Sequence, residues 1–172
     1  MNQFVYDITQ NNSNYGVKDA LQHVYKTKYP VIICVGSDLA IGDSLGPIIG
    51  SELNYKLFGK AYVYGTLESP ITAKEIKTVF NTIHLLHPKS KVLVIDAAVG
   101  DREEIGKIKI KDTGIKPGLG INKDLDEIGD VSIIGIVSDK ENPKNSIYNK
   151  TRLSLIKKIS NVIVLGILEY FK

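Results

Sequence analysis

Two aspartates, Asp43 and Asp96, come shortly after the two segments that the sequence marks most clearly as buried strands. The apolar segment 31–35 runs into the loop 36–47 that contains Asp43, and the apolar segment 91–95 is followed directly by Asp96. Strands joined by right-handed crossovers are parallel, so their carboxyl ends meet at one edge of the sheet. A pair of carboxylates at such an edge can share a proton, orient a water molecule or hold a metal ion.

Several chemistries are open to this pair. Asp96 follows mostly apolar residues, and burial raises the pKa of a carboxyl group because it disfavours the charged form. With Asp43 nearby, one group can ionise while the other stays neutral, or both can ionise around a divalent cation. The purely structural alternatives are that Asp43 caps the helix whose first turn holds Pro47, and that Asp96 binds the amides of its own turn.

Further polar residues are expected at the same edge because they also follow predicted strands. The glycines of segment 36–46 suggest a loop that lets backbone amides approach a ligand, but their spacing matches neither a dinucleotide-binding nor a P-loop pattern. A second glycine-rich loop covers 112–120, and its lysine can pair with a carboxylate, bind a substrate carbonyl or stay solvated. The candidate substrate-binding residues are Ser37, Asp38, Thr66, Glu68, Thr113, Gly114, Lys116 and Gly118.

The histidines and the cysteine argue against two other kinds of site. His23, His84 and His87 lie in predicted helical segments away from the strand ends, so none is placed to act as the base of a Ser-His-Asp triad. Cys34 lies inside the first apolar strand and is expected to be a small buried residue. The sequence therefore predicts neither a catalytic triad nor a cysteine–histidine zinc site.

The elements that must position these residues alternate along the chain. Helical spacing of apolar residues covers 17–25, 45–57, 71–86 and 145–171, and strands are predicted at 31–35, 61–64, 91–95, 104–110 and 131–137. The strict alternation of 104–110 favours an edge or antiparallel strand with one solvated face. Residues 1–16 are polar and are expected to form a loose arm or a strand-like lead-in. This order predicts a doubly wound α/β sandwich with a mostly parallel sheet.

Length and composition restrict the class of protein. The 172 residues are expected to form one domain spanning 1–172, with 43% hydrophobic residues and a net charge of +3. No arginine cluster or aromatic-interleaved basic face appears, so no nucleic-acid partner is expected. No run of eighteen apolar residues and no secretory signal pattern is present, so a cytoplasmic protein without a membrane partner is expected.

Four separated motifs resemble those of one family. The segments 36–47, 64–66, 94–97 and 112–120 are similar, in the same order, to segments of the YyaC-type sporulation proteins of endospore-forming Firmicutes. Those proteins are in turn similar to the spore germination protease and, more distantly, to hydrogenase maturation endopeptidases. The resemblance covers roughly residues 30–140 and implies a phosphorylase/hydrolase-like three-layer α/β/α fold. It also implies a peptidase-type site in which Asp43 and Asp96 match the two acidic residues of both enzyme groups.

The chain departs from the enzymes at one position of this resemblance. The germination protease reads Thr-Gly-Ile-His-Pro-Gly where this chain has Lys116 in place of the histidine. In the maturation enzymes a histidine from a comparable loop is the third metal contact. A lysine is protonated at neutral pH and repels a cation, so no resident metal is expected.

These observations lead to a ranked set of hypotheses. The first is a cytoplasmic, sporulation-associated peptidase that acts on a protein or peptide, in which Asp43 and Asp96 share a proton, one activating a water and the other protonating the leaving amine. Lys116 and amides of the glycine-rich loop would steady the oxyanion. The alternatives are a non-catalytic peptide-binding or regulatory protein on the same fold, a metal-dependent maturation-type endopeptidase and, last, a nucleotide-binding protein.

Overall fold

A six-stranded sheet forms the centre of the computed structural model, which describes residues 2–116, 127–140 and 151–172. The strand order is β1-β5-β6-β4-β2-β3. The strands are β1 Gln3–Asp7, β2 Pro30–Cys34, β3 Tyr62–Tyr64, β4 Lys91–Gly100, β5 Lys107–Lys111 and β6 Val131–Asp139. Strands β6, β4, β2 and β3 are parallel to one another, whereas β5 and β1 are antiparallel to their neighbours, so the sheet is mostly parallel, as predicted.

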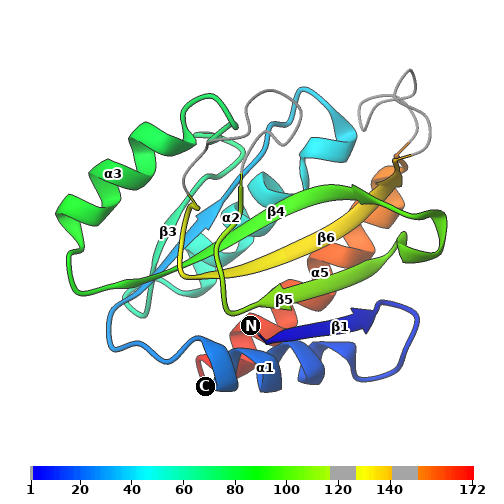
Figure 1. Cartoon of the computed structure of the whole chain (residues 1–172), viewed down its shortest axis with the longest axis horizontal. Coiled ribbons are helices and arrows are strands. Elements are labelled where there is room, and N and C mark those ends of the chain that lie inside the picture. Colours follow the sequence, from blue (N-terminus) through cyan, green and yellow to red (C-terminus); the bar gives the residue numbers. More distant parts are fainter. Residues whose placement is uncertain (1, 117–126, 141–150) are drawn as a thin grey trace.

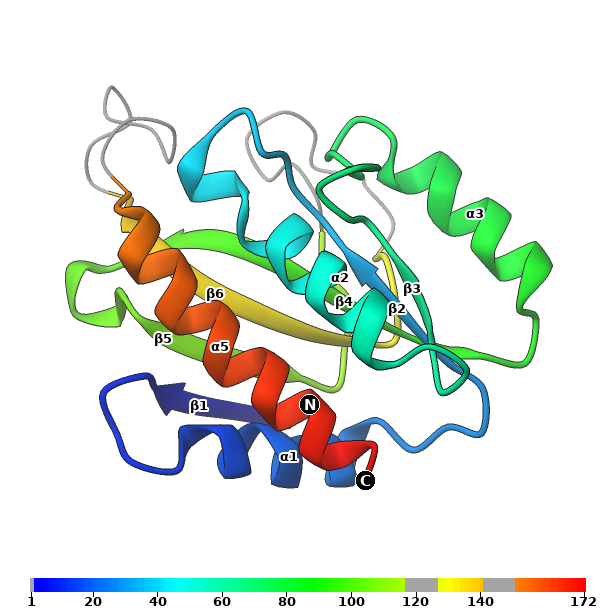
Figure 2. The same ribbon diagram turned by 180° about the vertical axis from the view of Figure 1, so that it is seen from behind.

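Helices cover both faces of this sheet. The α-helices are α1 Ser13–Val24, α2 Leu45–Lys56, α3 Ile76–Leu86 and α5 Leu153–Tyr170, and two short 3-10 helices are η1 Ile41–Asp43 and η2 Arg102–Glu104. Figure 2 shows α1, α2 and α5 together on one face, and Figure 1 shows α3 on the other. The structure therefore has the three-layer α/β/α architecture that the sequence predicts. Among the described residues, no helix combines the length and the apolarity that crossing a membrane requires.

The central strands are apolar on both faces because both faces are covered. Every residue of β2 is buried, with Ile32 and Cys34 in the core under α1, α2 and α5, and Val31 and Ile33 in the core under α3. Strand β5 differs: its two isoleucines are buried and its three lysines are not, which fits the antiparallel strand with one solvated face that the alternation predicts.

Helix α2 lies unusually close to the carboxyl ends of β2 and β3 because glycines form the contact. A Cβ on Gly46 would lie 2.0 Å from the Val35 carbonyl oxygen, and one on Gly50 would lie 1.9 Å from the Gly65 carbonyl oxygen. Any larger residue at these positions would push the helix away from the sheet. The helix that begins just after Asp43 is therefore held against the strand end that leads into Asp43.

The structure shows a strand at the amino-terminal end, rather than a loose arm. Strand β1 pairs with β5 over its whole length, from Gln3 opposite Lys111 to Asp7 opposite Lys107. Phe4 and Tyr6 pack against the main core, which gives this polar segment the apolar contacts that hold it in place. Helix α1 then begins at Ser13, before the predicted position 17.

Other elements differ from their predicted bounds, and β5 begins at Lys107 instead of 104 because η2 occupies the residues before it. Helix α3 begins at Ile76 instead of 71, because residue 71 forms a bridge with Val35 and the Glu75 carboxylate accepts a hydrogen bond from the Thr72 amide at 3.1 Å. Strand β4 continues through Gly100 rather than ending at residue 95. Helix α5 begins at Leu153, and positions 145–150 of the predicted helix lie outside the described residues.

One buried tyrosine connects α1 to two central strands. Tyr25 follows α1 and is fully buried, and its hydroxyl lies 2.8 Å from the Val31 carbonyl oxygen and 2.9 Å from the Lys91 carbonyl oxygen. The same hydroxyl accepts a hydrogen bond from the Val31 amide at 3.0 Å. Its burial raises the pKa of Tyr25 well above the usual range, so the group stays protonated and remains a donor.

Replacing this tyrosine by phenylalanine tests the connection. Tyr25→Phe leaves the Val31 amide and the strand carbonyls without their partner in a buried place, and we expect it to lower the free energy of unfolding by about 1–3 kcal/mol. Tyr29→Phe, at a tyrosine that is 46% exposed, is the control and should change stability by less than about 0.5 kcal/mol. Urea unfolding of the two variants measures both effects, and equal stability would show that the Tyr25 hydroxyl contributes nothing.

Candidate functional site

Asp43 lies at the end of η1, in the loop that connects β2 to α2. The loop folds back on itself: the Ser37 amide donates to the Asp43 carbonyl oxygen at 3.1 Å, and the Gly36 amide donates to the Ile71 carbonyl oxygen at 2.8 Å. The helix cap is Ser44, and α2 has no side-chain cap hydrogen bond. The structural alternative that Asp43 caps this helix is therefore wrong, and its carboxylate is left for other contacts.

Asp96 lies within β4 and not after its end. The pairing of β2 with β4 ends at Cys34 opposite Ile95, whereas β6 continues beside β4, with Asp96 opposite Ile134. The prediction that this strand ends at residue 95 is wrong. Beyond residue 95, where β2 has ended, β4 continues because its residues pair with β6. Asp96 is thus the first residue of β4 that has no partner in β2. It lies where the short strand β2 has ended and the longer strands β4 and β6 continue side by side.

The carboxylate of Asp96 is held close to its own backbone. Its Oδ1 accepts a hydrogen bond from the Ala97 amide at 2.8 Å, as one of the sequence alternatives expects. This bond uses one oxygen and leaves the other without a hydrogen bond to another described residue. Asp96 can therefore bind the amide of its own backbone with one oxygen and still take part in catalysis with the other.

The two carboxyl groups interact electrostatically. Burial raises the pKa of Asp96 to about 7, the Ala97 amide lowers it in part, and the negative charge of Asp43 raises it further. Burial also raises the pKa of Asp43, against a lowering by the hydrogen bond from the Ser37 backbone. In the described part of the chain no hydrogen bond joins the two carboxyl groups directly. The structure therefore brings the predicted pair within electrostatic range and leaves Asp96 able to hold a proton near neutral pH.

The other candidates after β2 and β3 mostly organise their own loops. The Ser37 hydroxyl accepts a hydrogen bond from the Leu39 amide at 3.2 Å, and Asp38 is exposed. Thr66 closes a turn, since its Oγ1 accepts from the Ser69 amide at 3.1 Å. The carboxylate of Glu68 accepts from the Ser51 hydroxyl of α2 at 3.4 Å. These residues lie at the expected sheet edge, but Glu68 does not join the aspartate pair in a cluster of three acids among the described residues.

The second glycine-rich loop is only partly described. Gly114 is buried, and a Cβ there would lie 2.2 Å from the Ile128 carbonyl oxygen, where Ile115 and Ile128 form an antiparallel bridge. Thr113 is half-buried, Lys116 is exposed, and Gly118 lies outside the described residues. No ion pair within the described part joins Lys116 to Asp43 or Asp96. The close backbone approach explains Gly114 without a ligand.

None of the histidines or the cysteine forms a hydrogen bond or ion pair with either aspartate in the described part of the chain, although Cys34 lies opposite Ile95, the residue before Asp96, and His87 follows the end of α3. The Nε2 atom of His87 is 2.8 Å from the Tyr64 hydroxyl, and Nδ1 of His23 is 2.7 Å from the Asp19 carbonyl oxygen. His84 is exposed beside Phe80 on α3. Cys34 is fully buried, and burial raises the pKa of its thiol, so the cysteine is a core residue with little thiolate character.

The donor set around the pair does not fit a nickel ion. Among the described residues no group of three or more histidine, cysteine or acidic side chains is close enough together to hold a metal. Nickel prefers nitrogen or sulfur ligands in addition to oxygen, and here two carboxylates stand alone. The described residues therefore do not supply the ligands of a nickel site.

Residues 5–166 match a family described as a protein of unknown function, DUF1256. The chain belongs to this family. It is also 39% identical over 137 residues to YyaC of Bacillus subtilis (strain 168), a protein named as uncharacterised, across 80% of this chain and 67% of that protein.

The fold is also found in a protease. The crystal structure of the [NiFe] hydrogenase maturation protease HycI from Thermococcus kodakarensis KOD1 superposes with a TM-score of 0.57, covering 91% of this chain and 98% of that one. The sequences are 14% identical, so this likeness shows a shared, peptidase-like fold and no more. The similarity to YyaC and the shared fold with HycI both agree with the family resemblance of segments 36–47, 64–66, 94–97 and 112–120.

A substitution at Gly36 tests whether the loop geometry is required. Gly36 has a φ of 137°, and a Cβ there would lie 2.0 Å from the Asp43 carbonyl oxygen. We expect Gly36→Ala to lower the free energy of unfolding by more than about 2 kcal/mol, because the loop must move. Gly59→Ala is the control: its φ is 77° but nothing lies within 4 Å, so only the backbone strain of about 1–2 kcal/mol is expected. Denaturant unfolding that finds the two variants equally stable would contradict the proposed close contact.

The raised pKa of Asp96 predicts a dependence of stability on pH. The folded-state pKa of about 7 lies above the ordinary value, so the folded protein binds more protons than the unfolded chain between about pH 4 and pH 7. The free energy of unfolding should therefore fall as the pH rises through this window. Asp96→Asn cannot ionise, and we expect it to be more stable than wild type at pH 8, by on the order of 2 kcal/mol, with a smaller difference at pH 4.

Urea unfolding at pH 4, 6 and 8 measures this effect. Asp19→Asn, at an exposed position on α1, is the matched control and should follow the wild-type profile. An Asp96→Asn profile parallel to that of wild type would show that Asp96 titrates normally.

Proposed function

We propose that this protein is a peptidase that hydrolyses a peptide bond with the Asp43–Asp96 pair. The observation that carries the proposal is geometric: two half-buried carboxyl groups, Asp43 in the loop after β2 and Asp96 on β4 just beyond the carboxyl end of β2, interact electrostatically. This is where open α/β sheets place their ligands. The peptidase-like fold supports the reaction class.

The difference between the two aspartates assigns their roles. Asp96, whose pKa is raised to about 7, holds the proton, and Asp43, whose pKa is raised less, is the ionised partner. Asp43 removes a proton from a water as the water oxygen attacks the peptide carbonyl carbon. The Asp96 proton passes to the leaving amine as the C–N bond breaks, and solvent then returns the proton of Asp43 to Asp96.

The remaining groups are assigned lesser roles. Lys116 and backbone amides of the glycine-rich loop steady the negative charge on the carbonyl oxygen. Ser37, Asp38, Thr66, Glu68 and Thr113 form the rim against which the peptide lies. The motif resemblance to the YyaC-type sporulation proteins supports an intracellular role in the spore-forming cell, with a protein or peptide as substrate.

Cleavage of a peptide library tests the proposal. The wild-type protein is incubated with tryptic peptides from sporulating Bacillus subtilis, and mass spectrometry identifies new termini. Asp43→Asn and Asp96→Asn should each lower the rate by about 10²–10⁴-fold while keeping the fold, as judged by circular dichroism. Asp19→Asn removes an exposed carboxylate on α1 and is the control. This variant should cleave the peptides at the wild-type rate.

Three other outcomes would overturn the proposal. Full activity of both asparagine variants would remove the pair from the mechanism. Saturable peptide binding without new termini would favour a non-catalytic binding or regulatory protein, for which the exposed Lys116 in place of the germination protease histidine is the specific observation. Cleavage that EDTA abolishes and a divalent cation restores would favour a metal-dependent endopeptidase.

A further inference from the structure

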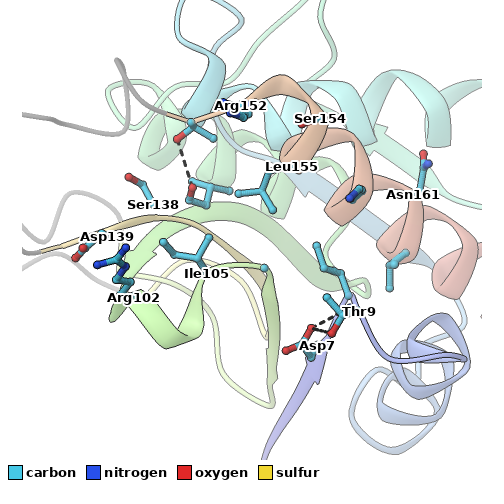
Figure 3. Close-up of a pocket in the computed structure, with 16 residues that line it drawn as sticks. Asp7, Thr9, Arg102, Ile105, Ser138, Asp139, Arg152, Ser154, Leu155 and Asn161 are labelled. Carbon is cyan, nitrogen blue, oxygen red and sulfur yellow. Dashed lines mark hydrogen bonds between the residues drawn. The ribbon is translucent and has the colours of Figure 1, made fainter.

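A second polar site lies on the opposite side of α5 from the sequence motifs described above. A pocket of about 980 Å³ opens between the end of β6, the start of β5, the loop after β1 and the amino-terminal half of α5 (Figure 3). Neither Asp43 nor Asp96 lines it. Its size is that of pockets that hold small organic ligands.

Both arginines of the chain line this one pocket. Of 22 basic residues only Arg102 and Arg152 are arginines, and they come from η2 and from the residue before α5, which are fifty positions apart in the sequence. Figure 3 shows Arg152 in the upper part of the view and Arg102 at the lower left, with Ser138 between them. Arginine, unlike lysine, presents a planar fork of donors that matches phosphate and carboxylate oxygens.

The two arginines share the pocket with acidic residues but form no ion pair within the described part of the chain. No ion pair of either guanidinium with another described residue is present, whereas the nearby Lys109 and Lys140 pair with Glu104 at 2.5 Å and with Asp101 at 2.7 Å. Asp101, which precedes Arg102, and Glu104, two residues after it, are thus engaged elsewhere. Asp139 lies beside Arg102 (Figure 3), but two guanidinium groups without an ion pair to a described residue are still suited to an anion.

The rest of the lining supplies both acidic groups and an apolar wall. Asp7 and Asp139 also line the pocket, and Asp7 accepts hydrogen bonds from the Thr9 amide at 2.9 Å and the Thr9 hydroxyl at 2.6 Å. Lys158 adds a third positive charge, so the lining has an excess of one positive charge. Ile105 and Leu155 form part of an apolar wall beside the arginines (Figure 3).

We propose that this pocket binds a small organic phosphate. The phosphate lies between Arg102 and Arg152, where a dianion matches two guanidinium charges better than a single carboxylate does. The organic part packs on Ile105 and Leu155. The site is independent of the aspartate pair and does not require the protein to be a peptidase.

Calorimetric titration with phenyl phosphate tests this assignment. We expect saturable binding at one molecule per chain, and Arg102→Gln and Arg152→Gln should each weaken it by at least about tenfold, the effect of losing a hydrogen bond to a charged group. Lys89→Gln, which removes an exposed positive charge in the loop after α3, is the matched control and should bind as wild type does. Asp43→Asn should also bind as wild type does, even if the peptidase proposal fails.

The comparison compounds separate the possible ligand chemistries. Weaker binding of benzoate and of inorganic phosphate than of phenyl phosphate supports a ligand with both a phosphate and an apolar body. Tighter binding of benzoate would overturn the phosphate assignment in favour of a carboxylate ligand. Absence of saturable phenyl phosphate binding, or equal weakening by Lys89→Gln and the arginine variants, would overturn the site itself.

Discussion

The close contact between α2 and the carboxyl ends of β2 and β3 is the constraint on which the candidate site depends. Gly46 and Gly50 bring the helix against the strand carbonyls, and Gly36 lets the intervening loop fold back on the Asp43 carbonyl oxygen. These contacts are between backbone atoms, so they leave little freedom for the loop. Asp43 is therefore positioned by the path of the main chain more than by interactions of its own side chain.

The position of Asp96 depends on a difference in strand length. Strand β2 stops while β4 and β6 continue, and the aspartate lies at this step. A carboxyl group there is half-buried by the surrounding protein. The resulting rise in its pKa makes the folded protein less stable at high pH and gives the group a proton to donate near neutral pH. The same burial thus lowers the stability of the folded protein at high pH and provides the proton donor of the proposed reaction.

The sequence predicted the layers and the parallel core because apolar runs are local signals, and it suggested that Asp43 and Asp96 lie near each other because each follows such a run. It did not predict that β4 continues past Asp96, because this depends on β6, which lies about forty residues later. It left residues 1–16 open between an arm and a strand, since β1 is ordered by its distant partner β5. The pocket with Arg102 and Arg152 has no sequence signal other than the scarcity of arginine, because separate elements bring the two residues together.

The placement of α1 beside α5 has a consequence for how the chain is made. Gly166 of α5 lies against Val17 of α1, where an added Cβ would be 2.6 Å from the valine Cβ, and the Tyr170 hydroxyl donates to the Tyr25 carbonyl oxygen. Figure 2 shows the two helices side by side on one face of the sheet. During synthesis on the ribosome, α1 emerges early but can bury its apolar face only after α5 has followed it. Helix α1 is made before α2, α3 and α5 but completes its packing only with the last of them, and a ribosome that stalls before α5 leaves this apolar face accessible to chaperones and aggregation.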